Sequence, residues 1–147
     1  MVEQNEALSL KLFVILTRAH RTIADKVAKD IRSYGLNTTE FGVLELLYNK
    51  GEQPIQQIGG RVLLASGSMT YVIDKLEKKG YIRRRPCPDD RRVIYAGITE
   101  QGHELMETIF PKHQEVLTRL LEGVTDEEKQ ELMTLLKKMS FYAQKLE

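Results

Sequence analysis

The stretch that decides the fold runs from residue 66 to residue 102, SGSMTYVIDKLEKKGYIRRRPCPDDRRVIYAGITEQG. Its first part has apolar residues every three or four positions, the pattern of one helix face, and Gly80 ends it. The apolar face consists of Met69, Val72, Ile73 and Leu76. The second part has two short extended stretches separated by Pro86, Pro88 and the pair Asp89-Asp90, which favour a turn. This order predicts a helix followed by a β-hairpin.

The predicted hairpin is strongly basic, whereas the chain as a whole has a net charge of only +1. Five arginines fall within ten residues, namely Arg83, Arg84, Arg85, Arg91 and Arg92. Residues 52–95 carry a net charge of +4, and residues 96–147 carry −4. Positive charge on a projecting hairpin beside a helix suits a phosphate backbone better than a small substrate. The alternative is a solvated arginine-rich loop without a partner.

Length and composition indicate one soluble, helix-rich domain. A chain of 147 residues with 41% hydrophobic residues is long enough to bury a core. Its single cysteine cannot form an intramolecular disulfide and fits a reducing, cytoplasmic compartment. No apolar run approaches the length of a membrane span, and the acidic N-terminus is not a secretory signal. No nucleophile–base pair or phosphate-binding loop predicts an enzyme, and no cofactor is expected.

The remaining pattern predicts further helices on both sides of this stretch. We expect helices at about 7–33, 38–50 and 55–62, and two more at 100–123 and 126–146. Asn37 with Glu40, and Thr125 with Glu128, have capping-box spacing. Thr99 is expected to cap the helix that begins at Glu100. Pro111 lies inside that helix and is expected to kink or break it, because proline has no N–H donor.

Two short helices followed by a hairpin form a winged helix-turn-helix, so we predict a mainly α fold with a small β-hairpin. Residues 36–99 would be the DNA-binding lobe of one domain spanning 1–147. The helices in 1–35 and 100–147 have more apolar surface than this lobe can cover. A two-fold dimer built from them is the simplest closed solution.

The second helix of such a unit enters the DNA major groove, which selects the candidate contact residues. On the helix the candidates are Ser66, which we expect to cap it, and Ser68, Thr70, Tyr71, Lys75 and Lys78. On the hairpin they are Arg84, Arg91 and Arg92, with Arg91 near the tip suited to a minor groove. Two alternatives stay open. In the first, Ser68 and Thr70 do not contact DNA and are only capping or surface residues of the helix. In the second, Arg92 does not contact DNA and instead braces the hairpin by pairing with Asp90 or Asp74.

Three ordered motifs resemble the MarR (multiple antibiotic resistance regulator) family. Residues 36–44, LNTTEFGVL, resemble its second helix, and residues 68–80 resemble its recognition helix. Asp90-Arg91-Arg92 followed by Ile98-Thr99 is similar to its wing motif, with Ile98 in place of the usual leucine. Ala65 stands where some members carry an acid that pairs with a wing arginine. The resemblance implies a homodimeric, cytoplasmic bacterial regulator, usually a repressor, on double-stranded DNA with a pseudo-palindromic operator.

The resemblance also implies control by small phenolic or aromatic compounds or by cysteine oxidation, and overall similarity favours quinone- or catechol-like effectors. The expected cavity lies where the first, second and fifth helices meet. Its candidate residues are Phe13, Arg18, His20, Tyr48, His103 and His113, each of which has an ordinary core, interface or surface reading. A redox role for Cys87, a metal site near His103 and Glu107, and a protein-interaction module are the alternatives. No metal site is predicted, because the histidines match no zinc spacing.

Overall fold

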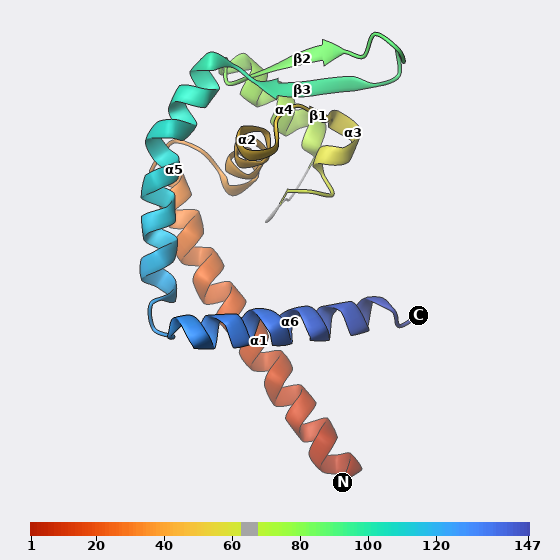
Figure 1. Cartoon of the computed structure of the whole chain (residues 1–147), viewed down its shortest axis with the longest axis vertical. Helices are drawn as coiled ribbons and strands as arrows, with labels where there is room; N and C mark the ends of the chain where they lie inside the picture. Colours follow the sequence, from red (N-terminus) through yellow and green to blue (C-terminus); the bar gives the residue numbers. More distant parts are fainter. Residues whose placement is uncertain (63–67) are drawn as a thin grey trace.

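A computed structural model of the chain describes residues 1–62 and 68–147. Its helices are α1 (Val2–Arg32), α2 (Thr38–Lys50), α3 (Ile55–Ile58), α4 (Met69–Lys78), α5 (Glu100–Leu121) and α6 (Asp126–Gln144). The strands β1 (Gln53–Pro54), β2 (Ile82–Pro86) and β3 (Ile94–Ile98) form an antiparallel sheet in the order β1-β3-β2. The expected mainly α fold with a small β-hairpin is therefore confirmed (Figure 1).

The predicted caps position the helices around this sheet. The capping box of α2 is complete, with Asn37 Oδ1 accepting from the Glu40 N–H at 2.8 Å and Glu40 Oε1 accepting from the Asn37 N–H at 3.0 Å. Thr125 and Glu128 make the same exchange at the start of α6. The Thr99 hydroxyl accepts from the Gly102 N–H at the start of α5. These local signals decide where the helices begin because they satisfy backbone N–H groups that have no partner inside the helix.

Three local features differ from the sequence-based expectation. Gln53 and Pro54 pair with Ala96 and Tyr95 as a third strand, where only a hairpin is predicted. Helix α3 ends at Ile58, four residues earlier than expected. Helix α5 continues through Pro111 to Leu121, so the proline does not break it. The buried residues Ile109 and His113 hold α5 against the core on both sides of that position, which outweighs one missing hydrogen bond.

The core lies between α2, α4, the sheet and the facing parts of α1 and α5. Among its fully covered side chains are Val43, Leu44, Ile58, Ile73 and Leu76. The C-terminal half of α1 joins it through Val27 and Ile31, and α5 joins it through Met106 and Ile109. Figure 1 shows this compact part at one end, with the N-terminal half of α1 extending away from it and helix α6 lying apart from it.

The outlying helices expose a large apolar surface. We call residues 2–16 of α1 together with helix α6 the apolar arms. Helix α6 buries none of its residues, although it carries Leu132, Leu135, Leu136, Met139 and Phe141. On α1, Leu8, Phe13 and Ile15 are each about two-thirds exposed. None of the described helices is both long and apolar enough to cross a membrane.

Candidate nucleic-acid interface and ligand cavity

Helix α4 presents a polar face to solvent because its apolar residues point into the core. Val72, Ile73 and Leu76 are buried, whereas the side chain of Tyr71 is 67% exposed. Ser68, Thr70 and Lys78 are exposed on the same helix, and Lys75 is half-buried. Ser68 occupies the N-cap position of α4, but within the described residues its side chain makes no capping hydrogen bond. Ser66, expected to cap this helix, lies outside the described residues.

A buried carboxylate ties the end of α4 to the start of α2. The Glu40 side chain is only 2% exposed, and its Oε2 accepts from Lys79 Nζ at 2.8 Å. Lys75 Nζ lies 3.9 Å from Oε1 of the same carboxylate. Burial acts to raise the pKa of Glu40, but the hydrogen bonds from Lys79 and from the Asn37 backbone outweigh it and hold this pKa below its ordinary value. Lys75, a predicted DNA contact, is therefore also positioned by Glu40.

The wing, residues 82–98, is braced on both faces by arginines. Arg84 reaches back to α4, where its guanidinium contacts both Asp74 and Glu77. The hydrogen bond to Asp74 is the main cause that raises the pKa of Arg84. On the other face Arg85 donates to Glu52 at 2.9 Å and lies 4.9 Å from the centre of the Tyr95 ring. Arg84, predicted to contact DNA, is thus placed as a brace between wing and helix.

The tip of the wing carries the other two arginines that were predicted to contact DNA. Arg91 and Arg92 follow Asp90 in the turn between β2 and β3, and both are exposed. Arg92 pairs with Asp90 at 3.2 Å, and its backbone carbonyl accepts from Gln56 of α3 at 3.0 Å. The bracing alternative for Arg92 is therefore seen with Asp90 and not with Asp74. No carboxylate among the described residues pairs with Arg91, which leaves its charge for an outside partner.

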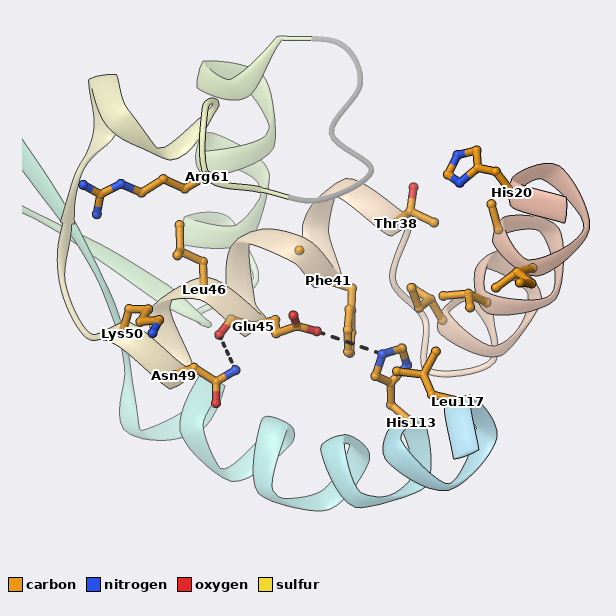
Figure 2. Close-up of a pocket in the computed structure, with 15 residues that line it drawn as sticks. His20, Thr38, Phe41, Glu45, Leu46, Asn49, Lys50, Arg61, His113 and Leu117 are labelled. Atoms are coloured by element: carbon orange, nitrogen blue, oxygen red, sulfur yellow. Dashed lines mark hydrogen bonds and ion pairs between the residues drawn. The ribbon is translucent and has the colours of Figure 1, made fainter. Parts of the chain in front are cut away.

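A cavity of about 640 Å³ opens between α1, α2 and α5. Its walls are mainly apolar, with polar groups at intervals along them. The apolar part includes Ile23, Val27, Ile31, Phe41, Leu46 and Leu117, and the polar part includes His20, Glu45, Asn49, Lys50, Arg61 and His113. Figure 2 shows Glu45 and His113 pointing toward one another beside the ring of Phe41. The expected position of the cavity, where the first, second and fifth helices meet, agrees with the structure.

The polar groups around His113 come from three helices. His113 of α5 is 7% exposed in its side chain, and its Nδ1 lies 3.3 Å from Asp30 Oδ2 of α1. Asp30 also accepts a hydrogen bond from the Tyr34 hydroxyl at 2.8 Å. Burial, followed by this hydrogen bond, raises the pKa of Tyr34 to about 12, so its hydroxyl remains a donor. On the cavity side, His113 Nε2 lies 4.0 Å from Glu45 Oε2 of α2.

The structure brings only two of the six candidate ligand residues to this cavity, His20 and His113. Tyr48 instead packs on His103 and Phe110, with ring centres 5.1 and 5.7 Å apart. Phe13 and Arg18 lie exposed on α1, away from the cavity walls. Contrary to the expectation, Phe13, Arg18, Tyr48 and His103 therefore do not line this cavity. Their positions along the helices place them on other faces, which residue type alone does not reveal.

Sequence reasoning missed Asp30 and Glu45, although one signal was present. Glu45 interrupts the apolar run FGVLELLY of residues 41–48, where an acid is unusual on a helix that packs into a core. Burial raises the pKa of Glu45, and the charge of His113 partly opposes this effect. Asp30 gave no such signal, because it stands among the charged residues of an ordinary helix end.

The two alternative sites, at Cys87 and at His103 with Glu107, involve fewer interacting groups than the cavity. Cys87 is half-buried, and its backbone N–H donates to the Val93 carbonyl at 3.0 Å inside the wing. His103 pairs with Glu107 at 3.2 Å, as their spacing suggests. Across the described residues no three histidine, cysteine or acidic side chains are grouped to hold a metal ion.

Comparison with known proteins agrees with this geometry. The MarR family model matches residues 36–94. The HTH-type transcriptional regulator MhqR of Bacillus subtilis is 50% identical over 135 residues, which cover 92% of this chain and 93% of MhqR. The crystal structure of Sco3205 from Streptomyces coelicolor in complex with DNA superimposes with a TM-score of 0.81 and 19% identity, over 91% of this chain and 86% of Sco3205.

A second solved structure that is similar in fold belongs to a protein regulated by a small molecule. It is BpsR of Bordetella bronchiseptica, whose DNA binding is regulated by 6-hydroxynicotinic acid. BpsR superimposes with a TM-score of 0.76 and 22% identity, over 88% of this chain and 98% of BpsR. At this identity the likeness concerns the fold alone.

Proposed function

Because the chain belongs to the MarR family of DNA-binding transcriptional regulators, we propose that it is a homodimeric repressor released from a pseudo-palindromic operator by a small aromatic or quinone-like effector. In this proposal residues 36–99 form the DNA-binding lobe, and residues 1–35 and 100–147 join the two copies. The two α4 helices enter successive major grooves, and the two wings reach the flanking minor grooves.

The observation that carries DNA binding is that some charged groups of the lobe are paired with one another, whereas others remain unpaired and exposed. Glu40 and Arg84 hold α4 and the wing in fixed positions, while Arg91 at the wing tip keeps an unpaired charge within the described residues. Helix α4 exposes further polar groups, including Ser68, Thr70, Tyr71 and Lys78. A rigid frame that carries unpaired cations and hydroxyls suits both phosphate contacts and base contacts. In this arrangement Arg84 and Arg92 act as braces, and Arg92 keeps enough exposure for a phosphate.

The apolar arms support the homodimer. A helix of 19 residues with none buried gains little stability from packing within its own chain. A second copy would cover this surface with an identical surface, as two-fold interfaces do. The lobe of each copy would then be held at a set distance from its partner, which is what paired operator half-sites require.

The cavity between α1, α2 and α5 supports control by an effector. It separates elements of the lobe from the helices that carry the apolar arms. A ligand acts on such a protein only by binding more tightly to a conformation that cannot hold both half-sites. The volume of about 640 Å³ and the largely apolar walls suit a small ring compound.

The test is a gel-shift titration of the purified protein on DNA fragments from upstream of its own gene, repeated between 50 and 200 mM salt. We expect saturable binding to one fragment with affinity that falls steeply as salt rises. Aromatic compounds added to the complex should then release the DNA. Binding that is absent, or that does not respond to salt, would reject the proposal in favour of a winged helix that docks an acidic protein.

A further inference from the structure

The wing tip, residues 87–93, is tied to the rest of the lobe by a side chain of α3. Gln56 Nε2 donates a hydrogen bond to the Arg92 backbone carbonyl at 3.0 Å. We propose that Gln56 is a positioning residue for DNA binding, because it fixes the place from which Arg91 reaches the DNA. This inference rests on the proposed function and adds a residue that was not among the predicted DNA contacts.

The wing tip lies beyond the three-stranded part of the sheet. Strand β1 pairs with β3 at Ala96 and Tyr95, whereas β2 and β3 continue together to the pair of Pro86 with Ile94. From there the wing is a two-stranded ribbon that ends in a turn, and such a ribbon has little stability of its own. A contact from outside the wing is therefore needed to fix the position of the tip.

Inside the tip, three hydrogen bonds hold the turn that carries Arg91. The Asp90 carboxylate accepts from the Arg92 N–H at 3.0 Å, and the Asp90 carbonyl accepts from the Val93 N–H at 3.1 Å. The Val93 carbonyl accepts from the Cys87 N–H at 3.0 Å. All three bonds lie within the tip. They give the turn its local shape but do not determine where the tip stands relative to α4.

The Gln56 hydrogen bond determines that position. Among the described residues, no other hydrogen bond or ion pair joins residues 87–93 to a part of the chain outside the wing. Helix α3 is itself anchored, because Ile58 is fully buried in the core, and Figure 1 shows α3 below the wing. The accepting carbonyl belongs to Arg92, the residue directly after Arg91. Gln56 therefore holds the backbone next to the exposed cation.

This tether links the two parts of the lobe that reach different grooves. In the proposed function α4 enters the major groove and Arg91 enters the minor groove. A tip without the tether would still carry the charge of Arg91, but it would have to become ordered during binding, and the lost entropy would lower the affinity. Because one neutral hydrogen bond has a small net effect, we expect a change of several-fold and not of several orders of magnitude.

The test uses two adjacent glutamines as variant and control. Gln56 and Gln57 are both exposed, and the Gln57 side chain makes no hydrogen bond within the described part of the chain. Gel-shift titrations would compare the natural full-length protein with Gln56→Ala and Gln57→Ala, each also in an Arg91→Ala background. We expect Gln56→Ala to weaken DNA binding about three- to tenfold in the natural background. In the Arg91→Ala background its effect should fall below about twofold, because it acts through Arg91. Gln57→Ala should have an effect below about twofold in both backgrounds.

A second measurement follows the tip without DNA. Hydrogen exchange of the free protein should be at least about threefold faster at the Cys87, Arg92 and Val93 amides in Gln56→Ala, because the turn opens more easily without its tether. Exchange in α4 and the unfolding midpoint should stay unchanged, since Gln56 is exposed. Gln57→Ala should leave exchange at the tip unchanged. The measurement thus separates positioning of the tip from a general loss of stability.

Four outcomes would overturn the proposal. They are equal DNA affinity of Gln56→Ala and the natural protein, unchanged exchange at the tip, a lowered unfolding midpoint that accounts for the loss of affinity, and an undiminished loss in the Arg91→Ala background. The last would mean that Gln56 contacts the DNA itself. Failure of the proposed function is distinct, because it appears in the natural protein as DNA binding that is absent or insensitive to salt, and the proposal would then fall with it.

Discussion

The DNA-binding lobe and the apolar arms differ in how far a single chain buries their apolar side chains. The lobe covers its apolar residues within one chain and fixes its charged groups with the Glu40–Lys79 and Arg84–Asp74 pairs. The arms leave Leu8, Phe13 and Phe141 more than half exposed. The lobe is therefore able to keep one shape on its own, whereas the apolar arms need a partner to cover them. Each part is therefore sensitive to a different class of substitution.

The largest effect is expected from charges placed on the arms. In Leu132→Glu/Leu136→Glu, two carboxylates one turn apart on α6 would have to be buried in the contact between copies. We expect a monomer whose operator affinity falls by about a thousandfold, because two linked half-site contacts become one. Light scattering and gel shift measure both effects. Gln130→Glu, which adds charge to the same helix outside the apolar set, is the control. A double variant that remains dimeric would show that the arms do not form the interface.

The second effect concerns the clamp inside the lobe. Glu40→Gln removes the buried charge that holds Lys79, and we expect a loss of about 2–3 kcal/mol of unfolding free energy. Because Lys79 is partly exposed, its charge is not stranded and the loss should not be larger. Urea unfolding followed by circular dichroism measures it, with the dimer unaffected in light scattering. An unchanged unfolding midpoint would mean that the pair does not support the lobe.

The same clamp predicts a dependence on pH. The pKa of Glu40 is lower in the folded chain than its ordinary value of 4.5, so its stabilising contribution is present above that value. The contribution is lost as the pH falls through the lowered pKa. The difference between the natural protein and Glu40→Gln should therefore be constant near pH 7 and should shrink below about pH 4.5. A difference that does not shrink at all as the pH falls below 4.5 would point to packing of the side chain and not to its charge.

The third effect separates unpaired from braced arginines of the wing. Arg91→Ala should weaken operator binding by about 1–2 kcal/mol and reduce the slope of log affinity against log salt by about one. Arg85→Ala, which removes an arginine held by Glu52, should leave the slope nearly unchanged. Gel-shift titrations at several salt concentrations distinguish the two. Equal slopes for both variants would mean that the wing tip does not contact a phosphate or a groove.

Much of the lobe was predictable because its signals are local. The capping residues Asn37 and Glu40 and the arginine-rich turn each determine structure within a few residues of themselves. The arms were also predictable, since their apolar residues outnumber what the lobe can bury. What escaped prediction depends on distant partners. The strand at Gln53 exists only because β3 lies beside it, and α5 passes Pro111 because the core holds the helix on both sides.

The cavity shows the same contrast between what local sequence determines and what distant partners determine. Its location was expected from the family resemblance, but which polar residues line it depends on how each helix is rotated about its axis. His20 and His113 line it, whereas His103, ten residues earlier on α5, faces Tyr48. Glu45 and Asp30 were missed because their role arises only when α1, α2 and α5 meet at His113. A residue type predicts what chemistry is available, and only the packing decides which residues share a site.

The smallest effect is expected at that meeting point. Burial raises the pKa of Glu45 in the folded chain, so its ionised form costs stability above that raised pKa. Glu45→Gln should therefore be slightly more stable than the natural protein at pH 8, by less than about 1 kcal/mol, since the carboxylate is one-third exposed and His113 partly compensates it. The gain should vanish as the pH falls toward 4.5, because the natural carboxyl takes up a proton. Thermal unfolding at both pH values measures this, with Glu104→Gln as the control. A variant that is less stable at pH 8 would mean that the Glu45 charge helps to hold α2 against α5. The Glu45–His113 pair would then be a structural ion pair, like Glu40–Lys79 in the lobe, and not part of a ligand site.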